Sequence, residues 1–384
     1  MKSSLPINEF IATVVARVSY KDAHNDIARE LRSHFEDVQE QLTGVGLDDK
    51  AIEAEALRRM GSAEDVGTQL NGVHQPRTDW LLLAAVALLL VGGMFAMQRA
   101  GVLAPQLLWL GIGAVVCVGV LTLKPRHLVA AAVPLYLATW GIGLLGFFTG
   151  PRVAGQPYLA VGPLHITVVE LSVVLFVVGL PGLLHTSRAA SSARRAAVLT
   201  AALAPLVAYA YLASSAAATI YFVAVATMLL VSAQPRHAVI ACSAVGGALL
   251  SLAFYRATFA GPAAYQALQQ SERHTDFVFH FLQAQSPVLA AAIAIVALCL
   301  VVYLIASCSE TKNPFSRTLM AGATAVLATG IVVGLASNIG FIPMPLTGIN
   351  LPFLSNGGSM LVAHMALVAI LVGIRRRKTI AFLT

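Results

Sequence analysis

Residues 341–359 read FIPMPLTGINLPFLSNGGS and lie between two long apolar segments. Three prolines and three glycines exclude a continuous helix, yet the stretch is too apolar for an ordinary solvated loop. Irregular backbone at membrane depth persists only where protein covers it or where it lines a water-filled cavity. We therefore expect either a re-entrant structural plug or a cavity wall whose backbone N–H groups, near Ser355 to Gly358, receive an anionic ligand.

The composition surrounding this stretch is that of a membrane protein. The chain is 58% hydrophobic and 11% charged, with a mean hydropathy of +0.78. We predict an all-α, polytopic integral membrane protein with about ten transmembrane helices, each long enough to cross the hydrocarbon core. The expected spans are residues 80–98, 105–123, 127–148, 166–185, 195–212, 214–233, 237–255, 287–307, 318–341 and 359–374.

The N-terminal part differs from the rest, because fourteen of the eighteen acidic residues fall within residues 1–79. Apolar residues recur there at helical spacing, as in the stripe Ile27, Leu31, Phe35, Val38 and Leu42. We expect two domains: a small soluble helical domain over residues 1–77 and a membrane domain over residues 78–384. The first resembles the cytoplasmic helical prefix of some bacterial permease-like proteins, which suggests a partner-binding or regulatory module.

The formal charge of +7 does not indicate a nucleic-acid partner, because the basic residues punctuate the apolar segments and form no patch. Twelve of them fall in loops on one side of the predicted spans and four, Arg99, Arg152, Arg256 and Arg273, on the other. The positive-inside rule then places both termini in the cytoplasm. The loops 256–286 and 342–358 face outward in this topology.

Only four acidic residues follow Asp79, namely Glu170, Glu272, Asp276 and Glu310. A carboxylate in or beside a bilayer is costly and is retained for a function by default. Asp276 and Glu272 share a short polar stretch, so we take Asp276 as the centre of any chemistry. The alternative is a solvated pair bonded to Arg256 or Arg273, and Glu170 is either a buried structural carboxylate or part of a substrate cavity.

Two motifs resemble those of a known family. The stretch 345–359, PLTGINLPFLSNGGS, looks like the C-terminal signature of the SEDS family (FtsW, RodA, SpoVE), with Asn356 where tyrosine is usual. The stretch 272–279, ERHTDFVF, is similar to the family's aspartate motif, and Asn338-Ile339-Gly340 also fits. The resemblance covers about residues 80–375.

The resemblance implies a peptidoglycan glycosyltransferase that polymerises lipid II on the outer face of the bacterial cytoplasmic membrane, in division, shape or sporulation. Asp276 matches the catalytic aspartate, and a divalent cation (Mg²⁺ or Mn²⁺) could assist, with no metal ligands assigned. Membrane lipids, the undecaprenyl-pyrophosphate-linked substrate and a class B penicillin-binding protein are the expected partners. The expected substrate-binding residues are Glu170, Arg256, Glu272, Arg273, Thr275, Thr347, Ser355, Asn356, Gly357, Gly358 and Ser359.

The chain also departs from the family pattern. Gln283-Ala284-Gln285 replaces an acidic pair, and Ser271 stands where proline is usual. Of the family's Gln-Pro-Ser-Glu element only Glu170 remains. These losses leave a second interpretation open, a non-catalytic scaffold that binds a class B penicillin-binding protein. A third, a transporter of lipid-linked substrates, would need a polar path that the apolar spans do not offer.

Overall fold

The computed structural model describes residues 5–21, 24–43, 48–74, 78–123, 125–153, 156–162, 164–188, 190–211, 215–232, 234–257, 275, 277–311, 313–341 and 350–376. The chain forms two compact units, Met1–Thr78 with Arg375–Thr384, and Asp79–Ile374. The proposed division into domains after residue 77 stays a prediction, because compactness alone does not show that either part folds by itself.

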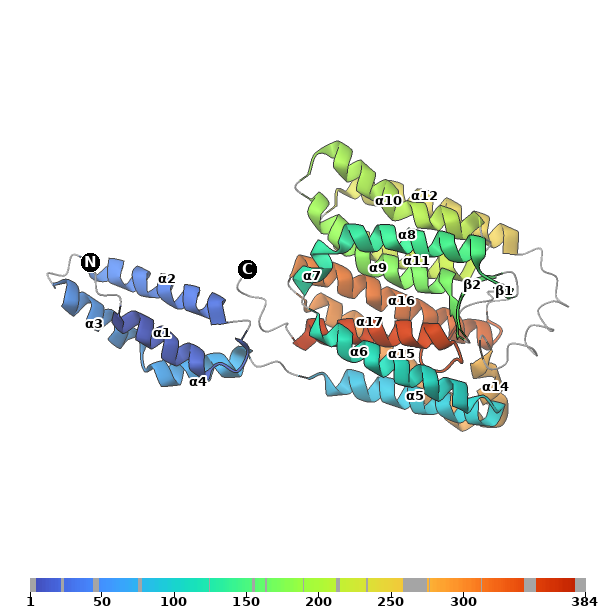
Figure 1. The fold of residues 1–384 in the computed structure, drawn as a ribbon, viewed down its shortest axis with the longest axis horizontal. Coiled ribbons are helices and arrows are strands. Elements are labelled where there is room, and N and C mark those ends of the chain that lie inside the picture. Colours follow the sequence, from blue (N-terminus) through green and yellow to red (C-terminus); the bar gives the residue numbers. More distant parts are fainter. Residues whose placement is uncertain are drawn as a thin grey trace. The chain divides into compact units, whose positions relative to one another are not determined.

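The N-terminal unit is built from helices α1 Leu5–Arg17, α2 His24–Leu42, α3 Asp49–Met60 and α4 Ala63–His74 (Figure 1). The stripe predicted on α2 is its buried face, since Ile27, Phe35, Val38 and Leu42 are buried and Leu31 is partly buried. Helix α1, which was not predicted, packs on α2 and α4 and contributes the buried side chains of Ile7, Ile11 and Val14.

The membrane unit contains the ten predicted spans as helices (Figure 1). Their bounds are α5 Trp80–Ala100, α6 Leu103–Thr122, α8 Ala132–Thr149, α9 Val168–Ser187, α10 Ser192–Tyr211, α11 Ser215–Val231, α12 Arg236–Ala257, α15 Pro287–Ser309, α16 Pro314–Asn338 and α17 Gly358–Arg376. Among the described residues, six of these are long and apolar enough to cross a membrane: α5, α6, α8, α15, α16 and α17. Shorter apolar stretches lie in α9, α11 and α12.

The third span is not continuous as predicted. A short helix, α7 Pro125–Ala130, precedes α8, and the break falls at Ala131. Pro134 explains the break, because a proline has no N–H to donate to the carbonyl of residue 130 and its ring crowds that carbonyl. The span therefore enters the bundle as two pieces.

The sequence did not predict two elements of the membrane unit, a small β-sheet and a short helix. Strands β1 Arg152–Val153, β2 Gln156–Val161 and β3 Leu164–Thr167 form a small antiparallel sheet in the order β1-β2-β3. Tyr158 pairs with Thr167 at the end of the β2–β3 ladder. The second element is α14 Val278–Gln285, a short helix inside the predicted outward loop 256–286.

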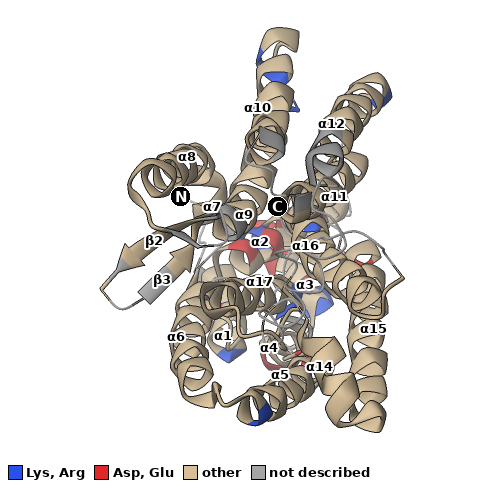
Figure 2. Cartoon of the chain, turned by 90° about the vertical axis from the view of Figure 1, so that its right-hand side faces the viewer, with Lys and Arg blue, Asp and Glu red and all other residues tan. Residues whose placement is uncertain are grey.

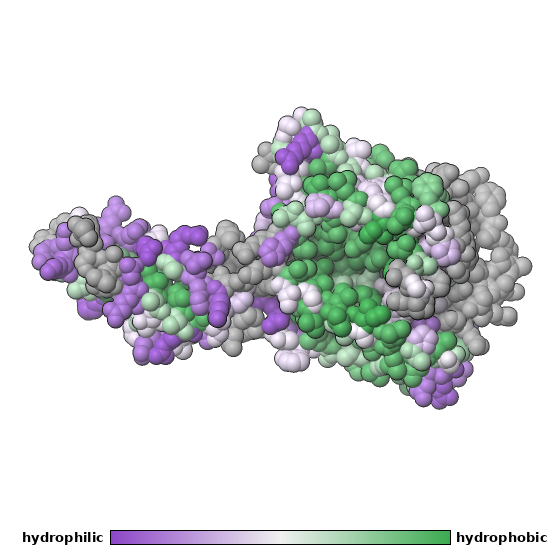
Figure 3. Space-filling view, viewed as in Figure 1, coloured by the Kyte–Doolittle hydropathy of each residue, from purple (hydrophilic) through white to green (hydrophobic). Residues whose placement is uncertain are grey.

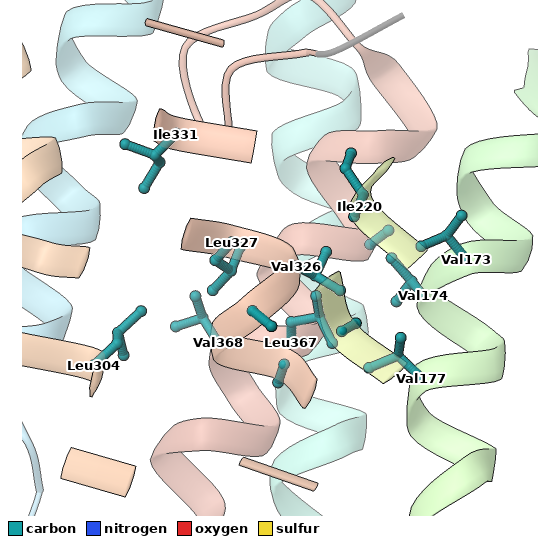
Figure 4. Close-up of a cluster of buried hydrophobic side chains, with 14 of the residues drawn as sticks. Val173, Val174, Val177, Ile220, Leu304, Val326, Leu327, Ile331, Leu367 and Val368 are labelled. Carbon is teal, nitrogen blue, oxygen red and sulfur yellow. The ribbon is translucent and has the colours of Figure 1, made fainter. Parts of the chain in front are cut away.

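The centre of the bundle is formed by α16 and α17. Buried residues make up 72% of the apolar window in each of these helices, but only 11% in α6. Val326 and Leu327 of α16, Leu367 and Val368 of α17, and valines of α9 lie together in this core (Figure 4). Gly322 of α16 lets that helix approach Met228 of α11 closely, as small residues do in membrane bundles.

The outer surface of the membrane unit is apolar, as the surface of a protein that spans a bilayer must be. Large apolar side chains are exposed on several helices, among them Val115, Phe148 and Val288, and they form a wide apolar area over the bundle (Figure 3). Lys and Arg lie at helix ends such as those of α10 and α12 (Figure 2). All ion pairs found among the described residues belong to the N-terminal unit, for example Arg17 with Glu64.

Candidate functional site

The described part of the C-terminal motif, Asn350–Ser359, is irregular backbone that ends in the first turn of α17. Residues 351–355 are buried, so protein covers this half of the predicted plug or wall, whereas Asn356 to Gly358 are half-buried. Phe353 has φ 70°, a conformation that bulky residues rarely adopt. Its surroundings must therefore hold the backbone in place.

Glycines let the motif approach its neighbours. A Cβ atom added to Gly93 of α5 would lie 2.5 Å from the carbonyl oxygen of Phe353, and one on Gly330 of α16 would lie 3.0 Å from the Pro352 ring. A Cβ on Gly358 would collide with the indole of Trp109 on α6. The motif is thus fitted closely among three helices, and glycine is required where backbone meets backbone or an aromatic ring.

Gln106 of α6 places a polar side chain against this segment. It is 2% exposed, and its Nε2 donates to the backbone carbonyl of Ser355 at 3.3 Å. Gln106 was not singled out in the sequence. The available signal was a lone amide in an otherwise apolar span, which is costly to bury without a partner.

Ser359 joins the motif to the beginning of α9. Its Oγ accepts the backbone N–H of Thr167 at 3.1 Å and lies 2.8 Å from the Thr167 hydroxyl. Glu170 lies three residues further along in α9, with its side chain outside the described part of the chain. The structure thereby brings the C-terminal motif next to the segment that carries Glu170.

Three polar atoms around the motif have no hydrogen-bond partner among the described residues: Gln106 Oε1, Asn350 Oδ1 and Ser355 Oγ. Buried polar atoms are paired with protein or water in the great majority of cases. Such unpaired oxygens, on the motif and on the helix beside it, are typical of a place where water or a polar ligand binds.

The predicted aspartate loop is described only at its end. Thr275 is half-buried and Phe277 is buried just before α14. The backbone N–H of His280 donates to Oδ1 of Asn338 at 3.0 Å, and Nδ2 of Asn338 donates to the Gly334 carbonyl at 2.8 Å. Asn338, 3% exposed, thus ties the helix that follows the aspartate motif to the end of α16.

Several predicted site residues lie outside what the structure describes. Asp276, Glu272, Arg273 and Thr347 are not among the described residues. Arg256 and Glu170 lie in α12 and α9, but their side chains are not described. The roles assigned to all twelve site residues, including an orientation of Asp276 toward Ser355 to Ser359, therefore stay predictions.

The described residues contain no group of three or more His, Cys, Asp or Glu side chains that could hold a metal ion. They do contain an apolar cavity of about 190 Å³ between α8, α9, α10 and β2, lined by residues such as Trp140, Phe147 and Phe176. Tyr209 and Ser172 bond to each other at 2.7 Å in its wall. Its apolar lining does not suit a phosphate group.

Similarity to solved structures agrees with this architecture: the membrane unit has the fold of the polytopic membrane protein RodA. The crystal structure of the rod-shape-determining protein RodA of Thermus thermophilus matches with a TM-score of 0.63 at 24% identity, over 78% of this chain and 97% of that chain. A RodA variant in which an aspartate is replaced by alanine matches with a TM-score of 0.62 at 24% identity, over 78% and 98%. A structure described as a peptidoglycan synthase complex that coordinates polymerization and crosslinking gives 0.63 at 22% identity, over 78% and 98%.

The family resemblance seen in the motifs is also confirmed. Residues 260–380 match the model of the FtsW/RodA/SpoVE family, described as cell cycle protein. The matched region contains both the aspartate motif and the C-terminal motif. A comparison with curated proteins finds no significant match.

Proposed function

We propose that this protein is a peptidoglycan glycosyltransferase that polymerises lipid II on the outer face of the bacterial cytoplasmic membrane. The observation that carries the proposal is the family match over residues 260–380, which includes Asp276 and the segment Ser355–Ser359. The close packing of that segment and the bond between Asn338 and the start of α14 support it, since both fix elements that flank the two motifs.

In the proposed reaction Asp276 acts as the general base. It removes the proton from the 4-hydroxyl of the acceptor sugar, whose oxygen forms a bond to the anomeric carbon of the donor sugar. The bond from that carbon to the undecaprenyl pyrophosphate breaks, and the pyrophosphate leaves with the electron pair and inversion at carbon. General-base catalysis of this kind contributes roughly 10²–10⁴-fold. Pyrophosphate leaves without a proton, so a second carboxylic acid is not required.

The remaining site residues would bind the substrate. Arg256 and Arg273 would balance the charge of the leaving pyrophosphate. Backbone N–H groups between Ser355 and Ser359, at the beginning of α17, would receive phosphate or sugar oxygens. Glu272, Thr275, Glu170 and Thr347 complete the proposed cavity.

A divalent cation is part of the proposal. Mg²⁺ or Mn²⁺ would act at the substrate's pyrophosphate, where the cation would neutralise developing charge, and no protein ligand is assigned to it. Pyrophosphate offers the oxygen ligands that such hard cations prefer. Removal of the cation with EDTA should then abolish polymerisation, and restored Mg²⁺ or Mn²⁺ should recover it.

A second candidate function is a scaffold for a class B penicillin-binding protein. The specific observation is that Gln283, Ala284 and Gln285 are exposed on α14 and offer no carboxylate, where the family has an acidic pair. In addition, one similar chain comes from a peptidoglycan synthase complex. The scaffold would keep the fold and the partner contact without turnover.

The experiment that tests the proposal is polymerisation of lipid II by the purified full-length chain, with Mg²⁺ or Mn²⁺ and with a class B penicillin-binding protein present. We expect glycan polymer from the wild type and at least a 10²-fold loss in Asp276→Asn, because the amide cannot accept the proton. Glu310→Gln, which removes an exposed carboxylate at the end of α15, is the matched control and should stay active. Absence of polymer from the wild type would favour the scaffold, whereas full activity of Asp276→Asn would show that Asp276 is not the general base.

A further inference from the structure

Three connections of the membrane unit meet at the end of α9. Nε2 of Gln234, in the α11–α12 connection, donates to the carbonyl of Leu184 at 3.4 Å and to Oγ of Ser187 at 3.3 Å. The ring of His185 lies 6.0 Å from the ring of Phe315 at the beginning of α16. Arg188, Arg195 and Arg317 lie around this junction, which contains no residue of the two family motifs.

Two of the three arginines are explained as helix caps. Nη2 of Arg195 donates to the carbonyls of Arg188 and Ala190 at 3.4 and 3.3 Å. Nη2 of Arg317 donates at 2.9 Å to the carbonyl of Val231, the last residue of α11. Cations at helix C-termini satisfy the last carbonyls and interact favourably with the helix dipole.

Arg188 does not fit this explanation. Its Nε is buried and has no hydrogen-bond partner among the described residues. Burial and the nearby positive charge of Arg317 lower the pKa of Arg188. The positive charges of Arg188 and Arg317 are thus close enough to repel each other, while the ion pairs found in the described part of the chain all lie in the N-terminal unit. An anion at this place would pair the Nε and remove the repulsion.

We propose that Arg188, Arg195 and Arg317 bind the phosphate of an anionic phospholipid headgroup, such as that of phosphatidylglycerol or cardiolipin. The planar guanidinium group matches a phosphate with two parallel hydrogen bonds. Basic clusters between membrane helices at the cytoplasmic surface recognise such headgroups, and the loop charges place this junction on that side.

Apolar surface beside the arginines favours a lipid over free phosphate. Leu230, adjacent to the Val231 carbonyl that Arg317 caps, is 72% exposed. An acyl chain of a bound lipid would cover this side chain, whereas a phosphate ion would leave it uncovered. The site is independent of the proposed glycosyl transfer and can be tested whether or not the chain polymerises lipid II.

The first test needs only the wild-type chain. The full-length protein, purified in a mild detergent, is incubated with equal amounts of phosphatidylglycerol and phosphatidylcholine, and retained lipids are counted by native mass spectrometry. Preferential retention of phosphatidylglycerol supports the proposal. Equal retention of both lipids overturns it, and so does complete displacement of phosphatidylglycerol by inorganic phosphate, which would identify a free-phosphate site.

The second test assigns the residues. The double variant Arg188→Gln/Arg317→Gln should bind phosphatidylglycerol at least about tenfold more weakly, because each basic residue near an anionic surface contributes roughly a fivefold effect. The control Arg99→Gln removes one charge from the end of α5, where the guanidinium lies 5.2 Å from the Phe95 ring centroid. An equal loss in the control, or none in the double variant, would contradict the assignment. If the double variant does not fold, the wild-type comparison decides.

Discussion

At the scale of single residues, the close packing of the C-terminal motif depends on glycines at positions where a larger side chain would not fit. The left-handed backbone of Phe353 and the close approach of Gly93 to its carbonyl leave little room for rearrangement. Gly358 begins α17 directly against Trp109. Overpacking such a place forces side chains from their preferred rotamers or moves backbone, at a cost of about 1–3 kcal/mol.

We therefore expect Gly358→Ala to lower the midpoint of thermal unfolding in detergent, because the new methyl group collides with the Trp109 indole. The matched control is Gly111→Ala on α6, where an added Cβ meets nothing within 4 Å. The control should be neutral or slightly stabilising, since alanine favours a helix over glycine. Equal midpoints for the two variants would show that the indole moves aside without cost.

The contacts that these motif residues make could not be predicted from the sequence. The motif singled out Ser355 and Ser359, but their partners Gln106 and Thr167 lie 249 and 192 positions away in the chain. No periodicity or local motif relates residues so far apart, because their proximity is created by helix packing. Gln106 could have been flagged as an amide in an apolar span, but its partner could not.

At the scale of elements, the ten spans were predictable because a bilayer demands long apolar runs with internally satisfied backbone. The break before α8 could have been read from Pro134. The β2–β3 hairpin and α14 were missed, since both are short and lie in connections where no periodic signal accumulates. The position of α14 depends on a tertiary bond to Asn338.

That bond yields a prediction for the elements flanking the aspartate motif. Asn338→Ala removes the acceptor of the part-buried His280 N–H, and loss of such a hydrogen bond costs about 0.5–1.5 kcal/mol. We expect faster amide hydrogen exchange in α14, measured by mass spectrometry on the solubilised protein. Asn313→Ala removes the N-cap acceptor of Ser316 at the other end of α16. This control should destabilise α16 locally and leave exchange in α14 unchanged; equal exchange in both variants would argue against the anchor.

At the scale of the whole molecule, charge determines which side of the membrane each site faces. The proposed catalytic and lipid-binding sites lie in loops of opposite predicted sides, so both depend on one topology. Twelve loop cations on one side against four on the other favour cytoplasmic termini. The inverse topology would place Asp276 in the cytoplasm, away from the surface on which the proposed polymerisation takes place.

Single cysteines at exposed positions can test this topology in a chain whose native cysteines, Cys117, Cys242, Cys299 and Cys308, are replaced by alanine. A membrane-impermeant maleimide should label Gln98→Cys, at the end of α5, in intact cells. Ser191→Cys, between α9 and α10, and Thr68→Cys, in α4, should react only after permeabilisation. Because the three positions are all exposed, a difference in labelling reports the side of the membrane and not burial. Labelling of Ser191→Cys in intact cells would invert the topology, and the proposed attack on lipid II at the outer face would then be impossible.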